Sequence, residues 1–314
     1  MKTPVAFIIF NRPEETQRVF EAIRAAQPET LLVVADGPRT EGERARCEAT
    51  RAIIDSVNWK CVVKKNYSET NLGCGKRVSS GIDWVFREVD RAIIIEDDCL
   101  PHPSFFPFCE ELLERYKNDE QIMNISGSFF QQKNRRFVVE ASYYSSILPH
   151  LWGWATWRRA WKKYDYNLTQ WPEAKKEQTL VPIFKNPAAY EYWSHVWDQY
   201  RNDKTNNWDS QWFFACVANK GICLNPTVNL VSNIGFGEKA THSKTPNDCA
   251  NIPTHAMTFP LIHPKKNTIN NQADAFTFRQ NFGIDKKLHH RILRPFKTAF
   301  PKLYWTIRQL FGKK

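Results

Sequence analysis

The sequence has no segment that could cross a membrane. Although 42% of the residues are hydrophobic, no run approaches the ~20 consecutive apolar residues that a membrane span needs. The N-terminal residues lead directly into a strand-like segment, without a signal-peptide pattern that ends in a small-residue cleavage site. The 8 cysteines include no CxxC pair and no regular spacing, which argues against a zinc site or a disulfide framework. We therefore expect a cytoplasmic protein with reduced thiols.

Two common nucleotide-binding motifs are also missing. The first predicted strand is not followed by the GxGxxG turn of dinucleotide-binding folds, and no GxxxxGKS or GxxxxGKT phosphate loop is present. These absences argue against NAD binding and against P-loop ATPase chemistry. The 314 residues are nevertheless enough to bury a sizeable core, in one large domain or two small ones.

Positive charge is abundant but unevenly distributed. The formal net charge is +11, and the segment from Lys286 onward contains nine Lys or Arg residues and no acid. Apolar residues lie among them, and Pro295 and Pro301 interrupt the segment. Such a tail can lie at an anionic membrane surface, here the inner face of the membrane, or dock on the protein's own body. A nucleic-acid-binding protein would spread its charge over a folded face, so we expect no nucleic-acid partner.

Strands alternate with helices in the N-terminal part of the chain. Short apolar runs bounded by turn residues predict buried strands, and apolar residues at helical spacing predict the helices between them. This alternation indicates parallel βαβ units, whose right-handed crossovers bring the strand ends to one edge of a sheet. The expected strands cover 4–10, 31–35, 60–64 and 92–95, and the expected helices begin at Pro13, at Glu41 and after the glycine-containing loop 71–76.

Polar residues follow three of these strands. They are Asn11-Arg12, Asp36 and the acidic triplet Glu96-Asp97-Asp98. Open α/β sheets bind their ligands at this edge. Adjacent carboxylates repel one another unless a cation lies among them, and such oxygen ligands suit Mg²⁺ or Mn²⁺. The triplet therefore predicts a metal-assisted nucleotide site, with a solvated acidic turn as the alternative.

The alternation stops in the second half of the chain. The aromatic segment 148–157 predicts either a core under a short helix or the floor of a sugar-binding site. Most of the chain beyond residue 245 reads as loop, with 276–282 docking back on the body. The other expected elements are helices at 103–117, 158–163, 187–201 and 211–219, strands at 122–126, 137–144 and 228–231, and a glycine-bearing loop at 233–242.

Together these features resemble the GT-A fold of nucleotide-sugar-dependent glycosyltransferases. The resemblance rests on Asn11-Arg12-Pro13, Asp36-Gly37, the acidic triplet and the later Trp208-Asp209. Within that superfamily the chain looks most similar to the N-acetylglucosaminyltransferase I type and to family 2-like proteins. In the former an EDD motif is likewise followed by proline and a Phe-Phe pair, here within 103–106. The resemblance extends over roughly residues 4 to 245.

The resemblance implies an α/β fold with a Rossmann-like parallel or mixed sheet between helices. It implies a catalytic domain over 1–280, with a nucleotide-sugar half at 1–128 and an acceptor half at 129–280. A basic amphipathic tail at 281–314 lies outside the match. The implied activity is metal-dependent hexosyl or N-acetylhexosaminyl transfer, with inversion, as in polysaccharide biosynthesis. The implied partners are a nucleotide diphosphate sugar, expected to be a UDP-sugar, and a glycan or lipid-linked acceptor.

The resemblance also assigns roles in the donor half. Asp98 would bind Mn²⁺ or Mg²⁺ that bridges the two phosphates. Glu96 and Asp97 would hold the ribose and the donor sugar, and Arg12 and Asp36 would contact the base and ribose. Two alternatives stay open, because Arg12 can be a surface residue at a helix start and Asp36 can belong to a plain turn.

Three further residues have assigned roles that rest on the resemblance or on their position. Asp209 matches the general base of inverting members, although Asp before a helix is also a common N-cap. His242 resembles a second metal ligand, with a loop histidine as the alternative. Lys76 follows Gly73-Cys74-Gly75 and would either neutralise phosphate or be solvated.

Two other functions compete with glycosyl transfer. A sugar-nucleotidyltransferase shares the Rossmann-like start but normally has a Gly-rich, basic loop after the first strand, which Asn11-Arg12-Pro13 does not match. A non-catalytic basic protein that binds an anionic surface would depend on the tail. We therefore expect the transferase.

Overall fold

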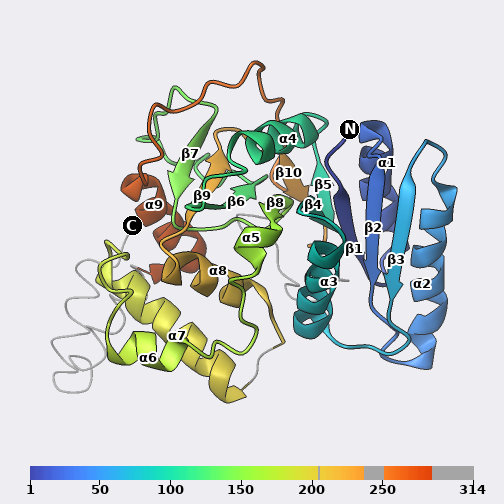
Figure 1. The fold of residues 1–314 in the computed structure, drawn as a ribbon, viewed down its shortest axis with the longest axis horizontal. Helices are drawn as coiled ribbons and strands as arrows, with labels where there is room; N and C mark the ends of the chain where they lie inside the picture. Colours follow the sequence, from blue (N-terminus) through green and yellow to red (C-terminus); the bar gives the residue numbers. More distant parts are fainter. Residues whose placement is uncertain (204–205, 237–250, 285–314) are drawn as a thin grey trace, which may run out of the picture.

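The computed structural model describes residues 1–203, 206–236 and 251–284 (Figure 1). His242, most of the glycine-bearing loop 233–242 and nearly all of the expected basic tail lie outside these ranges. The expectations about a second metal ligand and a membrane-contacting tail therefore remain predictions.

The N-terminal half contains the predicted parallel strands, in the order β3-β2-β1-β4. The helix expected from Glu41 to Val57 is divided into an α-helix and a 3₁₀ helix, η1, and the third strand begins two residues later than expected. The elements are β1 (Val5–Ile9), α1 (Pro13–Ala26), β2 (Thr30–Ala35), α2 (Glu41–Ala52), η1 (Ile53–Ser56), β3 (Val62–Tyr67), α3 (Cys74–Glu88) and β4 (Arg91–Glu96).

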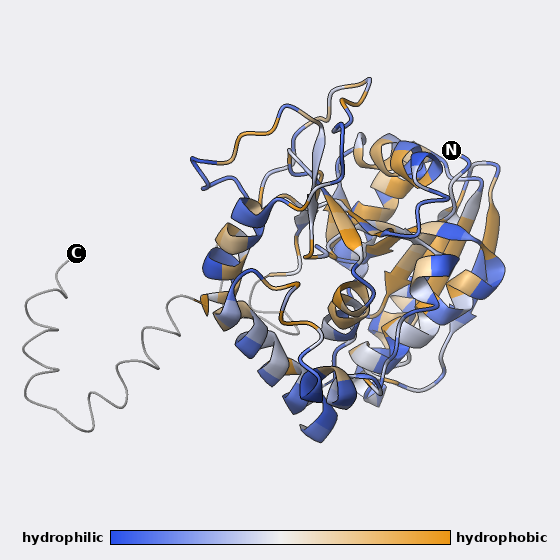
Figure 2. Cartoon of the chain, turned by 60° about the vertical axis from the view of Figure 1, so that its left-hand side comes forward, coloured by the Kyte–Doolittle hydropathy of each residue, from blue (hydrophilic) through white to orange (hydrophobic). Residues whose placement is uncertain are grey.

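Helices cover both faces of this sheet because alternate strand residues point to opposite sides. Phe7 of β1 belongs to a core cluster with Phe20 of α1 and Leu112 of α4 (Phe105–Arg115). Its neighbour Ile8 belongs to a different cluster with Ile82 of α3. Burial on both faces explains why these strands are continuous apolar runs, visible as the orange interior strands of Figure 2.

The sheet continues into the second half of the chain as a mixed sheet. A strand from the aromatic segment, β8 (Trp154–Trp157), pairs antiparallel with β4. Trp154 and Trp157 are buried, so for these two residues the core interpretation is correct. The remaining strands of the eight-stranded sheet are β6 (Ile122–Ser126), β9 (Ile222–Pro226) and β7 (Tyr143–Ser146). The strand predicted over 137–144 begins later in the structure, at Tyr143, as β7.

A second, two-stranded sheet joins the segment after the acidic triplet to a segment of the C-terminal half. The short strand β5 (Cys99–Pro101), directly after the acidic triplet, pairs antiparallel with β10 (Val231–Asn233). The strand expected at 228–231 is therefore shifted toward the C-terminus. This pairing brings the segment after Asn233 beside Asp98.

The helices of the second half pack around an aromatic cluster of their own. Trp193 of α7 lies against Phe213 of α8, with ring centroids 4.6 Å apart, and against Phe282 of α9 at 5.1 Å. The contact of Phe282 confirms that residues 276–282 dock on the body. The helices are α5 (Arg158–Trp161), α6 (Trp171–Lys176), α7 (Pro187–Asp203), α8 (Asp209–Ala218) and α9 (Asn271–Phe282).

The fold is α/β, with a mixed sheet flanked by helices, as the GT-A resemblance predicts. Within the described ranges, no helix combines the length and apolar character needed to cross a membrane.

A buried carboxylate in α9 makes the stability of this fold depend on pH. Asp274 is 5% exposed and accepts hydrogen bonds from Ser146 Oγ (2.5 Å) and Ile147 N (3.2 Å). Burial nevertheless raises the pKa of Asp274 to about 7. The unfolded chain therefore loses this proton at lower pH than the folded chain, so stability falls as pH rises through this range. We expect Asp274 to lower the free energy of unfolding by roughly 1–3 kcal/mol between about pH 5 and pH 8.

The Asp274→Asn variant should lack this component of the pH dependence, because an amide of the same shape has no proton to lose. Urea unfolding at several pH values measures the slope. Asp90→Asn serves as the control because the Asp90 side chain is 86% exposed, and it should retain the wild-type slope. An Asp274→Asn slope equal to that of the wild type would contradict the assignment.

Candidate functional site

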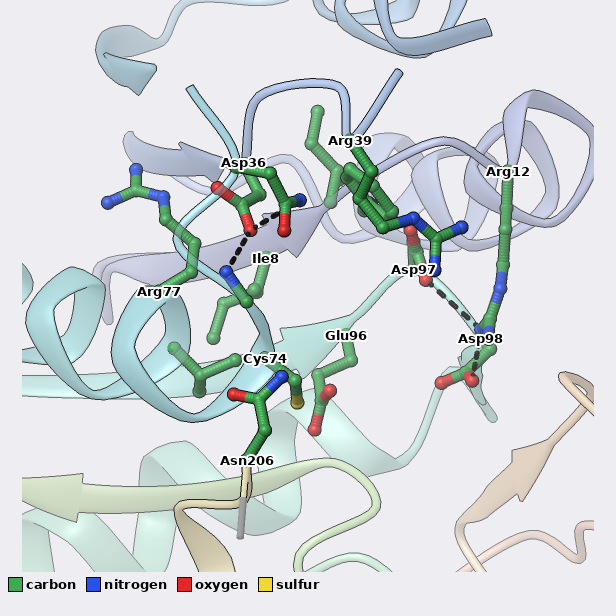
Figure 3. A pocket seen from close by; sticks show the side chains of 15 residues that line it. Ile8, Arg12, Asp36, Arg39, Cys74, Arg77, Glu96, Asp97, Asp98 and Asn206 are labelled. Carbon is green, nitrogen blue, oxygen red and sulfur yellow. Dashed lines mark hydrogen bonds and ion pairs between the residues drawn. The ribbon is translucent and has the colours of Figure 1, made fainter. Parts of the chain in front are cut away.

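The carboxyl edge of the sheet carries a cavity of about 190 Å³, called here the first cavity (Figure 3). Arg12 follows β1, Asp36 follows β2, and the acidic triplet ends β4. All three groups line this cavity, which confirms that the polar strand ends meet. Strand order explains the convergence, because β2, β1 and β4 are parallel neighbours.

Arg12 holds two of the three acids. Its Nη1 donates a hydrogen bond to Asp98 Oδ2 (2.5 Å) and lies 3.5 Å from Asp97 Oδ1, as Figure 3 shows. The backbone N–H of Phe10 donates to the other Asp97 oxygen at 2.9 Å. Arg12 is therefore an inward-facing member of the site and not a surface residue at a helix start.

The positive charge of Arg12 does not balance the three acids. Burial, together with repulsion from Asp98 and Asp97, raises the pKa of Glu96 to about 8. Burial and repulsion from Asp98 likewise raise the pKa of Asp97 to about 7. Burial is the larger cause and repulsion the smaller one, and a cation beside these carboxyls would act against both by favouring their charged forms.

The donor set fits a metal ion that is shared with a substrate. Among the described residues there is no group of three or more His, Cys, Asp and Glu side chains that could enclose a metal. Mg²⁺ in nucleotide-dependent enzymes is, however, usually held by one or two carboxylates together with substrate phosphates. Asp98 fits this requirement, because it lines the cavity and its Oδ1 accepts a hydrogen bond from a weak donor, Cys99 Sγ, at 3.5 Å.

Asp36 organises the loop that closes the first cavity. Its Oδ1 accepts hydrogen bonds from the N–H groups of Gly37 and Leu72, both at 2.9 Å. Its Oδ2 accepts from Asn71 Nδ2 (3.0 Å) and Gly73 N (3.1 Å). These four bonds connect the end of β2 to the start of α3. Asp36 therefore shapes the cavity wall, and a direct contact with nucleotide stays a prediction.

The two neighbouring basic residues at the start of α3 lie in different places. Lys76 is exposed and lines a separate cavity beside Tyr166, away from the acidic triplet. Arg77 is buried, lines the first cavity and donates to the Ala35 carbonyl at 3.1 Å. The exposed position of Lys76 agrees with the solvated alternative. Both residues occupy the first turn of one helix, so the helix phase places Arg77, which the sequence did not single out, at the first cavity.

Sequence reasoning missed four other polar or nucleophilic residues of the first cavity. The motif Asp36-Gly37-Pro38-Arg39 was a signal for Arg39, since a basic residue followed a polar strand end. Asn71 and Cys74 lie in the predicted glycine-containing loop 71–76, but no pattern there placed them at this cavity, and Asn206 comes from a segment distant along the chain. The residues are Arg39, Asn71, Cys74 and Asn206.

A second cavity, of about 410 Å³, extends the first toward the C-terminal half. The two share lining residues, including Glu96 and Asp98, and therefore adjoin each other. The second cavity is also lined by Asp209, Trp152 and Asn233. Glu96 and Asp98 therefore line the same cavity as Asp209, the candidate general base.

Asp209 is the first residue of α8, and Trp208 precedes it at the cap position. The Asp209 side chain is exposed, and its Oδ1 accepts a hydrogen bond from Ser210 N at 2.8 Å. Trp208 is buried and stacks on Trp154, with ring centroids 5.7 Å apart. Its carbonyl accepts from Tyr164 Oη at 3.1 Å. These contacts fix the position of Trp208 and therefore of its neighbour Asp209, which lines the second cavity.

The glycine loop before α3 connects the two halves beside the cavities. Gly75 N donates to Asn206 Oδ1 at 2.7 Å. Gly73 has φ +79, and a Cβ there would lie 2.7 Å from Asn206 Nδ2. Asn206, in the loop that precedes Asp209, therefore packs so closely against the backbone at Gly73 that a side chain at this position would collide with it.

A glycine also lies against Asp98 and supplies a testable prediction. A Cβ at Gly235 would lie 2.7 Å from the Asp98 Cβ and would overlap its carboxylate. The backbone cannot retreat easily, because Ile234 N donates to the Asp98 carbonyl at 2.8 Å. We expect Gly235→Ala to displace the carboxylate and to lower kcat/KM for the donor by about 10²-fold, the effect of a misplacement of about 1 Å.

Gly42→Ala is the matched control for this change. The nearest atom to a Cβ at Gly42 is Thr40 Oγ1 at 3.8 Å, an ordinary contact. Circular dichroism of both variants reports whether the fold is retained. Wild-type kinetics in a folded Gly235→Ala protein would show that the position of Asp98 is not critical.

No protein-family model matches the sequence, and no curated protein matches it. Similar solved structures include UDP-glucose pyrophosphorylase in complex with UDP-glucose, at 11% identity over 72% of this chain and 90% of that chain, with a TM-score of 0.37. The galactosyltransferase LgtC with donor and acceptor sugar analogs is 11% identical over 68% and 70% of the chains, with a TM-score of 0.35. Mouse xyloside xylosyltransferase 1 is 13% identical over 69% and 82%, with a TM-score of 0.33. These similarities concern the fold alone.

Proposed function

We propose that the protein is a glycosyltransferase that moves a sugar from a nucleotide diphosphate sugar to the hydroxyl of an acceptor, with inversion. One observation carries this proposal: Glu96 and Asp98 line the same cavity as Asp209, and this second cavity adjoins the first at the sheet edge. We assign the first cavity, beside Asp36, to the nucleotide and the second cavity, beside Asp209, to the donor sugar.

In this proposal the residues of the first cavity bind and orient the donor. The nucleoside lies at the carboxyl edge between the Asp36 loop and Arg39, where open α/β sheets bind ligands. Arg12 and Arg77 place positive charge beside the diphosphate. Asp98 would hold Mg²⁺ or Mn²⁺, which supplies Lewis-acid stabilisation of the leaving diphosphate when bound.

Asp209 acts as the general base in this proposal. It takes the proton of the acceptor hydroxyl while the oxygen forms a bond to the anomeric carbon. The bond between that carbon and the diphosphate oxygen breaks, and its electron pair leaves with the diphosphate. Such a base contributes on the order of 10²- to 10⁴-fold. Attack from the side opposite the leaving group inverts the anomeric centre.

A panel of UDP-, GDP-, CDP- and dTDP-sugars tests the proposal. The full chain is incubated with each sugar, with Mn²⁺ and with EDTA, and release of nucleoside diphosphate and protection against thermal unfolding are measured. We expect one base to give protection and slow hydrolysis that depends on Mn²⁺. Protection by none of the sugars would contradict the transferase and favour a non-catalytic binding protein. Formation of nucleoside triphosphate from a sugar nucleotide and pyrophosphate would identify a sugar-nucleotidyltransferase instead.

A further inference from the structure

A third cavity, of about 260 Å³, opens on the other side of Asp209. It shares Leu151, Trp152 and Asp209 with the second cavity, so these residues form the wall between the two. Its remaining lining residues come from five separate parts of the chain, at 130, 148–150, 193, 210–213 and 277–282. Its volume is just below the roughly 300–1,000 Å³ of pockets for drug-sized ligands, which suits a small ring better than an extended chain.

Aromatic rings dominate the lining of the third cavity. The Phe130 ring lies 5.4 Å from Trp152 and 4.5 Å from the ring of His150, measured between centroids. Phe130 and Trp152 are only half-buried, so their ring surfaces are available in the cavity. Apolar ring faces beside polar groups are the surfaces on which the C–H faces of a sugar can stack.

The third cavity also contains hydrogen-bonding groups that lack partners. His150 Nε2 and Trp193 Nε1 are buried and have no hydrogen-bond partner within the described ranges. Both residues line the cavity, and His150 and Trp193 are 5% and 8% exposed. A buried polar atom without a partner is costly, and a bound ligand with hydroxyl groups would relieve this cost.

The charges of the residues that line the third cavity favour an uncharged ligand. Among its described lining residues, none is Lys or Arg, and Asp209 is the only acid. Burial lowers the pKa of His150 to about 4, so this histidine is neutral at physiological pH. A phosphate or carboxylate would therefore meet repulsion from Asp209, and no Lys or Arg among the described lining residues would compensate it.

We propose that the third cavity binds a single uncharged sugar ring of the acceptor, stacked on Phe130 and Trp152, with one hydroxyl directed at Asp209. This assignment rests on the proposed transferase function, because it makes Asp209 the boundary between the donor and acceptor sides. It narrows the acceptor to a glycan or glycoside whose reacting sugar carries no acidic group.

Titration of the full chain with simple methyl glycosides tests this assignment. The neutral probes are the glucoside, galactoside, mannoside and N-acetylglucosaminide, and the anionic probes are methyl glucuronide and glucose 1-phosphate. Binding is followed by saturation-transfer NMR and tryptophan fluorescence, in the presence of the nucleoside diphosphate that the donor panel selects, or without nucleotide if it selects none. We expect a neutral glycoside to bind and the anionic probes to bind more weakly.

Phe130→Ala should weaken binding of that glycoside about tenfold, and Phe130→Leu, which preserves apolar bulk, should weaken it severalfold. Phe130 does not line the donor cavities, so nucleotide binding and donor hydrolysis should be unchanged. Phe137→Ala is the matched control. This half-buried phenylalanine packs on Phe129 and Tyr144, outside the third cavity, and its loss should not affect glycoside binding.

The possible outcomes separate the two proposals. If the donor is hydrolysed but no neutral glycoside binds, or Phe130→Ala binds it as the wild type does, the acceptor-site assignment is wrong and the transferase stands. Preferred binding of an anionic probe would also overturn the assignment. If no nucleotide sugar binds, the transferase fails, and Phe130-dependent glycoside binding still decides whether the cavity is a sugar site.

Discussion

The Asp209→Asn variant is expected to lose sugar transfer by about 10²- to 10⁴-fold, while its affinity for the nucleoside diphosphate stays close to that of the wild type. Asparagine has the shape of aspartate but cannot accept the proton of the acceptor hydroxyl. It can still accept the hydrogen bond from Ser210 N that the carboxylate accepts now, so α8 should begin at the same place. Steady-state transfer rates and calorimetric nucleotide binding measure the two effects separately.

Asp165→Asn is the matched control for a purely structural role. Asp165 accepts backbone hydrogen bonds from Asn167 and Thr169 and lies outside the three cavities. Its replacement should leave transfer unchanged. If Asp209→Asn and Asp165→Asn retain activity equally, Asp209 only supports the start of α8 and another group must be the base.

The Asp98→Asn variant should lose donor binding as well as turnover. Asp98 lines both donor cavities, and its neutralisation removes the charge that would attract a divalent ion. Because a metal Lewis acid contributes several kcal/mol to the stabilisation of a leaving group, we expect kcat/KM to fall by about 10³-fold. The Mn²⁺ concentration needed for half-maximal activity should rise in parallel.

The fold of Asp98→Asn should be retained. Loss of the Arg12 ion pair is offset by weaker repulsion on Glu96 and Asp97, whose pKa values Asp98 helps to raise. Asp55→Asn provides the control, because Asp55 forms an exposed ion pair with Lys65 far from the cavities. Wild-type kinetics for Asp98→Asn, with an unchanged Mn²⁺ requirement, would remove the acidic triplet from the mechanism.

The strand-end residues of the first cavity could be predicted because their signals are local. Each polar group directly follows a short apolar strand, and parallel pairing then brings Arg12, Asp36 and the acidic triplet together. Hydrophobic runs and strand ends are properties of adjacent residues, so the sequence alone suffices to locate them. The direct contact of Arg12 with Asp98 was not predictable, because it depends on side-chain rotamers at the helix start.

Only part of the third cavity could be predicted from the sequence. Residues 148–152 belong to the aromatic segment predicted as core or as the floor of a sugar-binding site, whereas packing between distant segments supplies the other walls. Phe130, Trp193 and Phe282 lie on different elements, and only the tertiary fold makes them walls of one cavity. The strand β9 and the pairing of β7 with it were likewise missed. The segment of β9 contains Asn225 and Pro226, and that of β7 ends in two serines, so neither shows a strong alternation of apolar and polar residues.

The most direct test of the account is calorimetric titration of Mn²⁺ into the full chain, with and without the nucleoside diphosphate selected by the donor panel. If Asp98 shares the ion with the diphosphate, each ligand must tighten the other by the same factor. We predict weak Mn²⁺ binding alone, at least tenfold tighter binding with the nucleotide, and no such coupling in Asp98→Asn. Equal nucleotide affinity in Mn²⁺ and in EDTA would contradict a diphosphate site built on the acids that end β4.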